Sequence, residues 1–208
     1  MPEEPKIQEV TLPELAQISG LAGELALVDL GHPVLRAPAR PLAREAFGSP
    51  ELAKAVAALW RTLDAIGHGV GLAAPQVGWP FALFCLDDRE GTRLALVNPH
   101  LLDLPGAPDF IWVEEHEGCL SVPGFWGRVR RPASLSVAGL DLMGKEVVVD
   151  GHGFLARILA HESDHLVGRL YLDLAESGTF APEDPASLPG GFIFYTPPPR
   201  ASFRTRTR

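Results

Sequence analysis

The sequence predicts an α+β fold, in which antiparallel strands surround a central helix and a second helix packs against a sheet. Two pairs of short apolar runs, each pair joined by turn residues, predict β-hairpins. Two longer stretches repeat apolar residues at helical spacing. The paired runs are 81–86 with 94–97 and 135–142 with 147–150, and the helical stretches are 50–66 and 153–166.

Size and composition narrow the class of protein. The chain has 208 residues, of which 46% are hydrophobic, so one folded domain with a sizeable core is expected. A net charge of −8 argues against a DNA-binding protein, and no apolar run is long enough to span a membrane. The first residues are acidic and lack the apolar stretch of a signal peptide, which predicts a cytoplasmic location. The two cysteines are expected to be thiols.

Helix signals are clearest in the first third of the chain. Residues 11–21 predict a short helix, and the apolar run 25–30 predicts a strand. A longer helix is expected to begin at Ser49, a capping hydroxyl, followed by Pro50 at the first helical position. Gly67 then ends that helix.

The stretch 69–76 reads Gly-Val-Gly-Leu-Ala-Ala-Pro-Gln. Its small residues let the backbone lie close to another group, and Gln76 offers an uncharged amide donor. No Lys-Ser/Thr pair follows, which argues against a phosphate-binding loop. An ordinary turn remains an alternative for the stretch taken alone.

The middle of the chain combines short strands with polar connections. Asn98-Pro99 is expected to end the 94–97 strand, and 110–113 predicts a strand that runs into an acid-rich segment. That segment contains Cys119 in a polar setting. A turn is predicted at 123–127 and a final strand at 171–174.

The helical stretch 153–166 carries the strongest chemical signal. His161 and His165 are four residues apart, so both rings lie on one helix face, about one turn apart. Two such imidazoles can hold a metal ion, with Glu162 beside them to transfer protons. The alternative is a pair of unrelated surface histidines.

Apolar residues at helical spacing predict that this helix is buried, where unpaired histidines and carboxylates would be unfavourable without a metal ion. These residues are Phe154, Ile158 and Leu159. Asp150 is expected to cap the helix and Gly168 to end it.

A metal site on this helix needs a third ligand, and Cys119 in the segment Glu-Gly-Cys-Leu-Ser at 117–121 offers one. Together with 69–76 and His-Glu-Ser-Asp-His at 161–165, this segment resembles the peptide deformylase family, with all three motifs in the family's order. The resemblance covers residues 26–175. It leaves an N-terminal extension, 1–25, and a Pro/Gly-rich, Arg-ended tail, 176–208, outside the match.

The resemblance implies a metal-dependent hydrolase that removes the formyl group from the initiator methionine of nascent polypeptides and releases formate. It assigns the metal ligands to Cys119, His161 and His165, with a fourth position open for water. One divalent ion is implied, Fe²⁺ first and Zn²⁺ or Ni²⁺ as alternatives. Glu162 would accept the proton of the attacking water and pass it to the leaving amine.

The resemblance also implies how the substrate is held. The Gln76 side-chain amide and the Leu120 backbone N–H would donate to the oxyanion. The methionine side chain would contact Val70, Phe154 and Ile158, and the peptide would pair with Gly71 as an added strand. The alternative for the three apolar residues is a plain core role.

One supporting contact and one departure accompany the resemblance. Arg131 is expected to pair with Asp164 behind the metal-binding histidines. Ser163 stands where the family usually has a bulky apolar residue, and its hydroxyl is expected to bond to the Leu159 carbonyl.

The last twelve residues carry four arginines and no acid, which suits a transient contact with ribosomal RNA. A solvated tail without function is the alternative. Two rival functions are a zinc peptidase of the HExxH type, whose third ligand usually lies downstream, and a non-catalytic metal-binding module.

Overall fold

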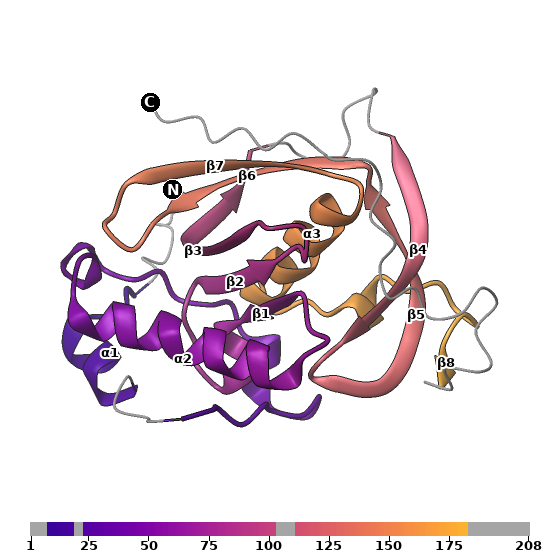
Figure 1. Ribbon diagram of the computed structural model, residues 1–208. Helices are drawn as coiled ribbons and strands as arrows, with labels where there is room; N and C mark the ends of the chain where they lie inside the picture. The colour runs from indigo at the N-terminus through magenta and orange to yellow at the C-terminus, as the bar shows by residue number, and fades with distance from the viewer. Residues whose placement is uncertain (1–7, 19–22, 103–110, 183–208) are drawn as a thin grey trace, which may run out of the picture.

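The computed structural model describes residues 8–18, 23–102 and 111–182 and shows two antiparallel sheets around one helix (Figure 1). A five-stranded sheet has the order β1-β2-β3-β6-β7, and a three-stranded sheet has the order β4-β5-β8. Helix α3 packs on the five-stranded sheet and also contacts β5, so it lies between the two sheets. The α+β prediction, with its central helix, is confirmed.

The elements have the following bounds. The helices are α1 (Leu12–Ile18), α2 (Pro50–Ile66) and α3 (Phe154–Leu166), with short 3₁₀ turns η1 (Pro33–Arg36), η2 (Arg44–Ala46), η3 (Ala74–Val77) and η4 (Tyr171–Asp173). The strands are β1 (Gly71–Ala73), β2 (Leu83–Asp87), β3 (Arg93–Leu101), β4 (Trp112–Cys119), β5 (Val122–Pro132), β6 (Ser134–Leu140), β7 (Glu146–His152) and β8 (Ala181–Pro182).

Helix α2 begins and ends as predicted. The Ser49 hydroxyl accepts a hydrogen bond from the Leu52 N–H at 3.1 Å, and Pro50 occupies the first turn. Gly67 ends the helix at φ +79°, a conformation that favours glycine. The apolar face of α2 packs into the core beside β1 and β2.

Both predicted hairpins are confirmed, but the first extends beyond its expected end. Strand β3 continues through Asn98 to Leu101, with a bulge between Val97 and His100. Asn98 adopts φ +50°, and its side chain exchanges two hydrogen bonds with the Leu42 backbone, at 2.8 and 2.9 Å. These bonds stabilise the bulge, so Asn98-Pro99 interrupts the pairing without ending the strand.

The acid-rich segment is part of a long hairpin, which corrects two predictions. Residues 114–119 belong to β4 and 123–127 belong to β5, so the turn lies at Leu120-Ser121. Acidic residues are less common in strands than in other structure, so β-propensity did not predict β4. Here arginines from β5 and α3 pair with the β4 acids and make a charged strand stable.

Two other predicted strands are wrong. Residues 25–30 run as an irregular segment, and Val28 donates one backbone hydrogen bond to the Gln76 carbonyl at 2.9 Å. Residues 171–173 form η4, because the Asp173 carboxylate accepts a hydrogen bond from the Leu170 N–H at 2.9 Å and closes a tight turn.

Helix α3 begins differently from the prediction. Gly153 is its N-cap, and no side chain caps it. The Asp150 carboxylate instead accepts a hydrogen bond from the Ser136 hydroxyl at 2.7 Å, across the β6–β7 hairpin. Gly168, at φ +74°, follows the last turn of α3, so the predicted end is confirmed.

The described part of the N-terminal extension packs against the rest of the described chain. Val10 and Leu15 are fully buried, and Val10 exchanges backbone hydrogen bonds with Pro41 and Ala43. Helix α1 confirms the first part of the predicted 11–21 helix, whereas residues 19–21 lie outside the described ranges. The basic tail, from residue 183 onward, also lies outside them.

Among the described residues, none of the helices combines the length and the apolar character needed to cross a bilayer.

Candidate metal centre

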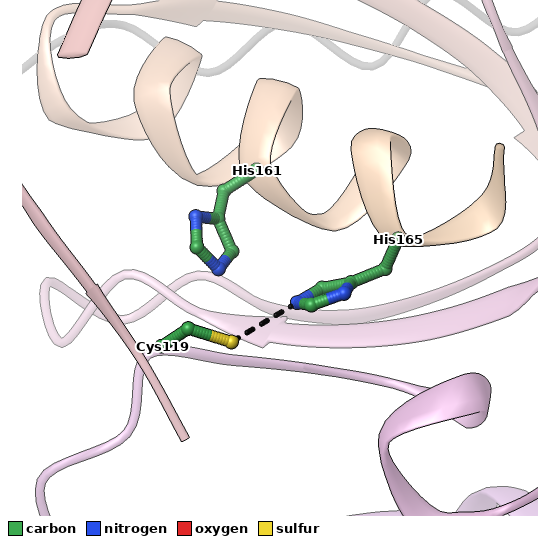
Figure 2. Close-up of side chains that lie close together, drawn as sticks. All are labelled: Cys119, His161 and His165. Carbon is green, nitrogen blue, oxygen red and sulfur yellow. Dashed lines mark hydrogen bonds between the residues drawn. The ribbon is translucent and has the colours of Figure 1, made fainter. Parts of the chain in front are cut away.

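Two elements bring the three predicted ligands together (Figure 2). Cys119 ends β4, and His161 and His165 project from α3 toward it. One ligand atom from each residue lies within 4.8 Å of the others, and Cys119 Sγ is 3.4 Å from His165 Nε2. The i, i+4 spacing on α3 places the two rings 5.0 Å apart, centroid to centroid.

The surroundings of these three residues fit a divalent cation. One sulfur and two imidazole nitrogens form a donor set that suits several first-row divalent ions. His165 is 1% exposed, and its Nδ1 atom has no hydrogen-bond partner among the described residues. The Glu162 Oε2 atom beside the site is likewise buried without a partner. A cation with bound solvent would give the unpaired Glu162 oxygen a hydrogen-bond partner, and it would bind His165 through Nε2, the ring nitrogen that faces Cys119.

Glu162 is a buried carboxyl in this site, with 3% of its surface exposed. Burial raises the pKa of Glu162 to about 7, and the neighbouring His161 opposes this rise. The carboxyl is therefore buried beside the ligands, and no residue in the described part of the chain forms an ion pair with it.

Gln76 presents its amide nitrogen to the metal site. The Gln76 side chain is buried, and its Oε1 accepts the Ala73 backbone N–H at 2.8 Å. A backbone N–H can only donate, so this bond fixes which end of the amide is oxygen. The Nε2 group consequently points to Cys119 Sγ, at 3.5 Å.

A buried carboxylate, Glu117, orients the first histidine and was missed by the sequence analysis. Its Oε2 lies 3.1 Å from His161 Nδ1, and both of its oxygens accept hydrogen bonds from Arg131 at 2.9 Å. Arg157 adds a bond to Oε1 at 2.6 Å. Burial disfavours the charge, but the bonds from Arg131 and His161 hold the pKa of Glu117 well below its usual range. A proton held on Nδ1 leaves His161 Nε2 free for a metal ion.

Sequence periodicity contains the signal for this network. Glu117 and Cys119 are two residues apart on one strand, and the side chains of both face the histidines of α3. Arg157 precedes His161 by one helical turn on α3. Recognising both residues would have required the acid-rich segment to be read as a strand.

The predicted Arg131–Asp164 pair is present. Arg131 Nη1 donates to Asp164 Oδ2 at 2.6 Å, and both side chains are buried. Arg169 donates to the other Asp164 oxygen at 2.8 Å. The carboxylate next to His165 in the chain is therefore anchored to β5 and to the segment after α3.

Replacing Asp164 with asparagine is expected to destabilise the protein by about 1.5–3 kcal/mol, because it weakens the charge-assisted hydrogen bonds from Arg131 and Arg169, while Arg131 keeps its two bonds to Glu117. Chemical denaturation measures the loss. The control is Asp64→Asn, which removes an exposed pair with Arg93 and should change the free energy of unfolding by less than about 1 kcal/mol. Equal effects of the two substitutions would contradict a supporting role for Asp164.

Tyr171 is another contact that the sequence analysis did not find. Its ring stacks on His161, with centroids 6.3 Å apart and planes at 24°. Its hydroxyl donates to the Phe125 carbonyl at 2.9 Å. The segment 171–174 was predicted as a strand, and only the observed 3₁₀ turn directs this ring toward the histidine.

The residues predicted to contact substrate lie around α3. Val70, Phe154 and Ile158 pack in one apolar cluster, and Gly71 begins the neighbouring β1 strand. Leu120 follows Cys119 in the hairpin turn, and its side chain packs on the other apolar cluster, beside α2. The predicted bond from Ser163 to the Leu159 carbonyl is wrong, because the buried Ser163 hydroxyl has no partner among the described residues.

The HExxH motif lies on a helix between two antiparallel sheets, and a cysteine from a separate strand lies beside its histidines. This arrangement is that of a metal-dependent hydrolase of α+β fold. A model of the polypeptide deformylase family matches residues 25–180. The chain belongs to the peptide deformylase family, whose members hydrolyse N-formyl groups.

Individual relatives agree with this assignment. The chain is 39% identical over 149 residues to a peptide deformylase of Desulforudis audaxviator, covering 72% of this chain and 92% of that relative. It is 43% identical over 157 residues to one of Mycolicibacterium paratuberculosis, covering 69% and 77%. The crystal structure of an Acinetobacter baumannii class I type b deformylase with Met-Ala-Ser bound superposes with a TM-score of 0.68 at 31% identity, covering 74% of this chain and 99% of that one.

These comparisons confirm the predicted family, fold and deformylase activity. They favour the deformylase over the alternative of a zinc peptidase of the HExxH type.

Proposed function

We propose that the chain removes the formyl group from the N-terminal methionine of nascent polypeptides at the site formed by Cys119, His161, His165 and Glu162. The observation that carries this proposal is the convergence of the three ligand atoms within 4.8 Å, beside a buried carboxylate. The Acinetobacter baumannii relative binds Met-Ala-Ser, a tripeptide that begins with methionine.

Cys119, His161 and His165 would hold one divalent ion, Fe²⁺ first and Zn²⁺ or Ni²⁺ as alternatives. When bound, the ion would supply Lewis-acid polarisation of the formyl carbonyl and lower the pKa of a water molecule. The buried Glu117 lies 3.1 Å from His161 Nδ1, so it would hold a proton there and leave the other ring nitrogen free to bind the ion.

Glu162 would accept the proton of the attacking water and deliver it to the leaving amine. Its position supports this role, because Oε2 is buried and no described residue donates to it. A carboxylate that is already hydrogen bonded to the protein would have to break those bonds before it could take the proton.

Gln76 and Leu120 would stabilise the negative charge that develops on the formyl oxygen when the formyl carbon is attacked. The Gln76 amide nitrogen is aimed at Cys119 Sγ by the bond between its oxygen and Ala73. It is thus held as a donor before the substrate arrives, which is the requirement for electrostatic stabilisation. The backbone N–H of Leu120 would be the second donor.

Substitution of Gln76 by alanine is expected to lower kcat by about 10²–10³, as for loss of one oxyanion donor. KM should change little, because the donor acts on charge that develops in the transition state. Steady-state formate release measures both constants. A kcat within about threefold of the wild type would reject the assignment.

Val70, Phe154 and Ile158 would receive the methionine side chain, and Gly71 would pair with the peptide backbone. The three apolar residues are neighbours in the cluster around α3, close in the chain to His161 and to the 69–76 motif. An unbranched methionine side chain packs readily into an irregular apolar surface of this kind.

Formate release from formyl-Met-Ala-Ser under anaerobic conditions with added Fe²⁺ tests the proposed function. We expect turnover that a chelator abolishes, together with no cleavage of casein peptides. Cleavage of casein without formate release would contradict the proposal and favour the zinc peptidase.

The proposed location is the cytoplasm, where nascent peptides leave the ribosome. The four arginines of the last twelve residues supply a positive charge that would suit a transient contact with ribosomal RNA. Ribosome binding and the absence of DNA binding stay predictions.

A further inference from the structure

Gly71 lies so close to the Glu162 side chain that no Cβ atom fits between them. A Cβ built on Gly71 would be 2.2 Å from Glu162 Oε1, 2.6 Å from Cδ and 2.9 Å from Cγ. Real Cβ contacts essentially never fall below 3.0 Å. An alanine at this position therefore requires the carboxylate or the strand to move.

The backbone conformation does not explain the glycine. Gly71 is an extended residue of β1, paired with Leu86 of β2, and it is not among the glycines with positive φ. Any L-residue could adopt this conformation, so the missing side chain matters because of the space that Glu162 occupies.

Packing is the main restraint on the Glu162 carboxylate. Its Oε2 atom has no hydrogen-bond partner within the described part of the chain, and no ion pair from a described residue anchors it. The Glu162 carboxylate packs directly against the β1 backbone at Gly71. A shift of about 1 Å in a catalytic group can lower a rate 10²-fold. The packing of Glu162 against Gly71 is therefore expected to affect the catalytic rate.

We propose that Gly71 is a positioning residue, which holds the Glu162 carboxylate beside the metal ligands, in the position that proton transfer requires. This inference rests on the proposed function of Glu162. It differs from a role in pairing with the peptide, because a lost peptide contact would raise KM, whereas a displaced carboxylate lowers kcat at saturating substrate.

The kinetic test compares Gly71→Ala in two backgrounds. In the wild type, this substitution should lower kcat for formyl-Met-Ala-Ser by about 10²-fold, with unchanged metal content. In a Glu162→Asp background, the shorter side chain withdraws from β1, and the same substitution should lower kcat by less than about threefold. A higher KM with unchanged kcat, or an equal loss of kcat in both backgrounds, would overturn the proposal.

A second test is independent of activity. Gly71→Ala should lower the unfolding temperature of the wild type, but lower it less in a Glu162→Ala background, where the crowded space is empty. Gly139→Ala is the control, because a Cβ there would lie 2.7 Å from Leu96 Cγ and should act equally in both backgrounds. Equal effects of Gly71→Ala in the two backgrounds would contradict the packing argument. If this coupling is observed while the wild type releases no formate, the proposed function fails and the contact between Gly71 and Glu162 stands.

Discussion

Replacing Glu162 with glutamine is expected to lower kcat for formate release by about 10²–10⁴, the range for loss of a general acid–base group. Glutamine has nearly the same shape as glutamate, so it should fit against Gly71 and leave the three ligands in place. It can neither take a proton from water nor deliver one to the amine. The metal content should therefore stay at the wild-type level, and steady-state kinetics with metal analysis checks both expectations.

The matched control for this substitution is Glu114→Gln, which removes an exposed carboxylate from β4, away from the α3 face. Its kcat should equal that of the wild type. If Glu162→Gln kept kcat within about threefold, the proton-transfer role would be refuted. Loss of the metal from Glu162→Gln would instead show that the carboxylate supports the ligands.

Replacing Cys119 with alanine is expected to remove the thiolate ligand and, with it, both metal binding and measurable formate release. Loss of a residue that only hydrogen bonds to a metal ligand lowers metal affinity by about 10–100-fold, so loss of a ligand itself should have a larger effect. The fold should persist, since Cys119 lies at the end of β4 and is only partly buried. Metal content after gel filtration, with circular dichroism as the folding check, measures the outcome.

Cys85 provides the control, because it is the other free cysteine and lies fully buried in β2. Burial raises the pKa of the Cys85 thiol far above its usual range, as expected for an inert core thiol. Cys85→Ala should reduce stability and keep the metal. Retention of one ion per chain by Cys119→Ala would exclude this cysteine as a ligand.

Local sequence signals sufficed for the elements that follow ordinary propensity. Helix α2 carries its own start and stop signals in Ser49, Pro50 and Gly67, and the β2–β3 and β6–β7 hairpins consist of short apolar runs joined by turn residues. The i, i+4 histidines and the cysteine motif predicted the residues that converge at the metal site.

Long-range contacts account for what the sequence did not predict. Strand β4 is stable because Arg131 and Arg157, distant in the chain, neutralise its buried Glu117. Tyr171 reaches His161 only through a 3₁₀ turn that depends on the Asp173 side chain. Gly71 and Glu162 are in contact although they lie ninety-one positions apart in the sequence. A pattern of neighbouring residues could not predict this contact.

The measurement that tests the account most directly is metal analysis of anaerobically purified protein, combined with X-ray absorption at the edge of the bound metal. The account predicts one divalent ion per chain, coordinated by one sulfur and two imidazole nitrogens, with lighter ligands from solvent. A coordination shell without sulfur, or a folded and active protein that contains no metal, would contradict it.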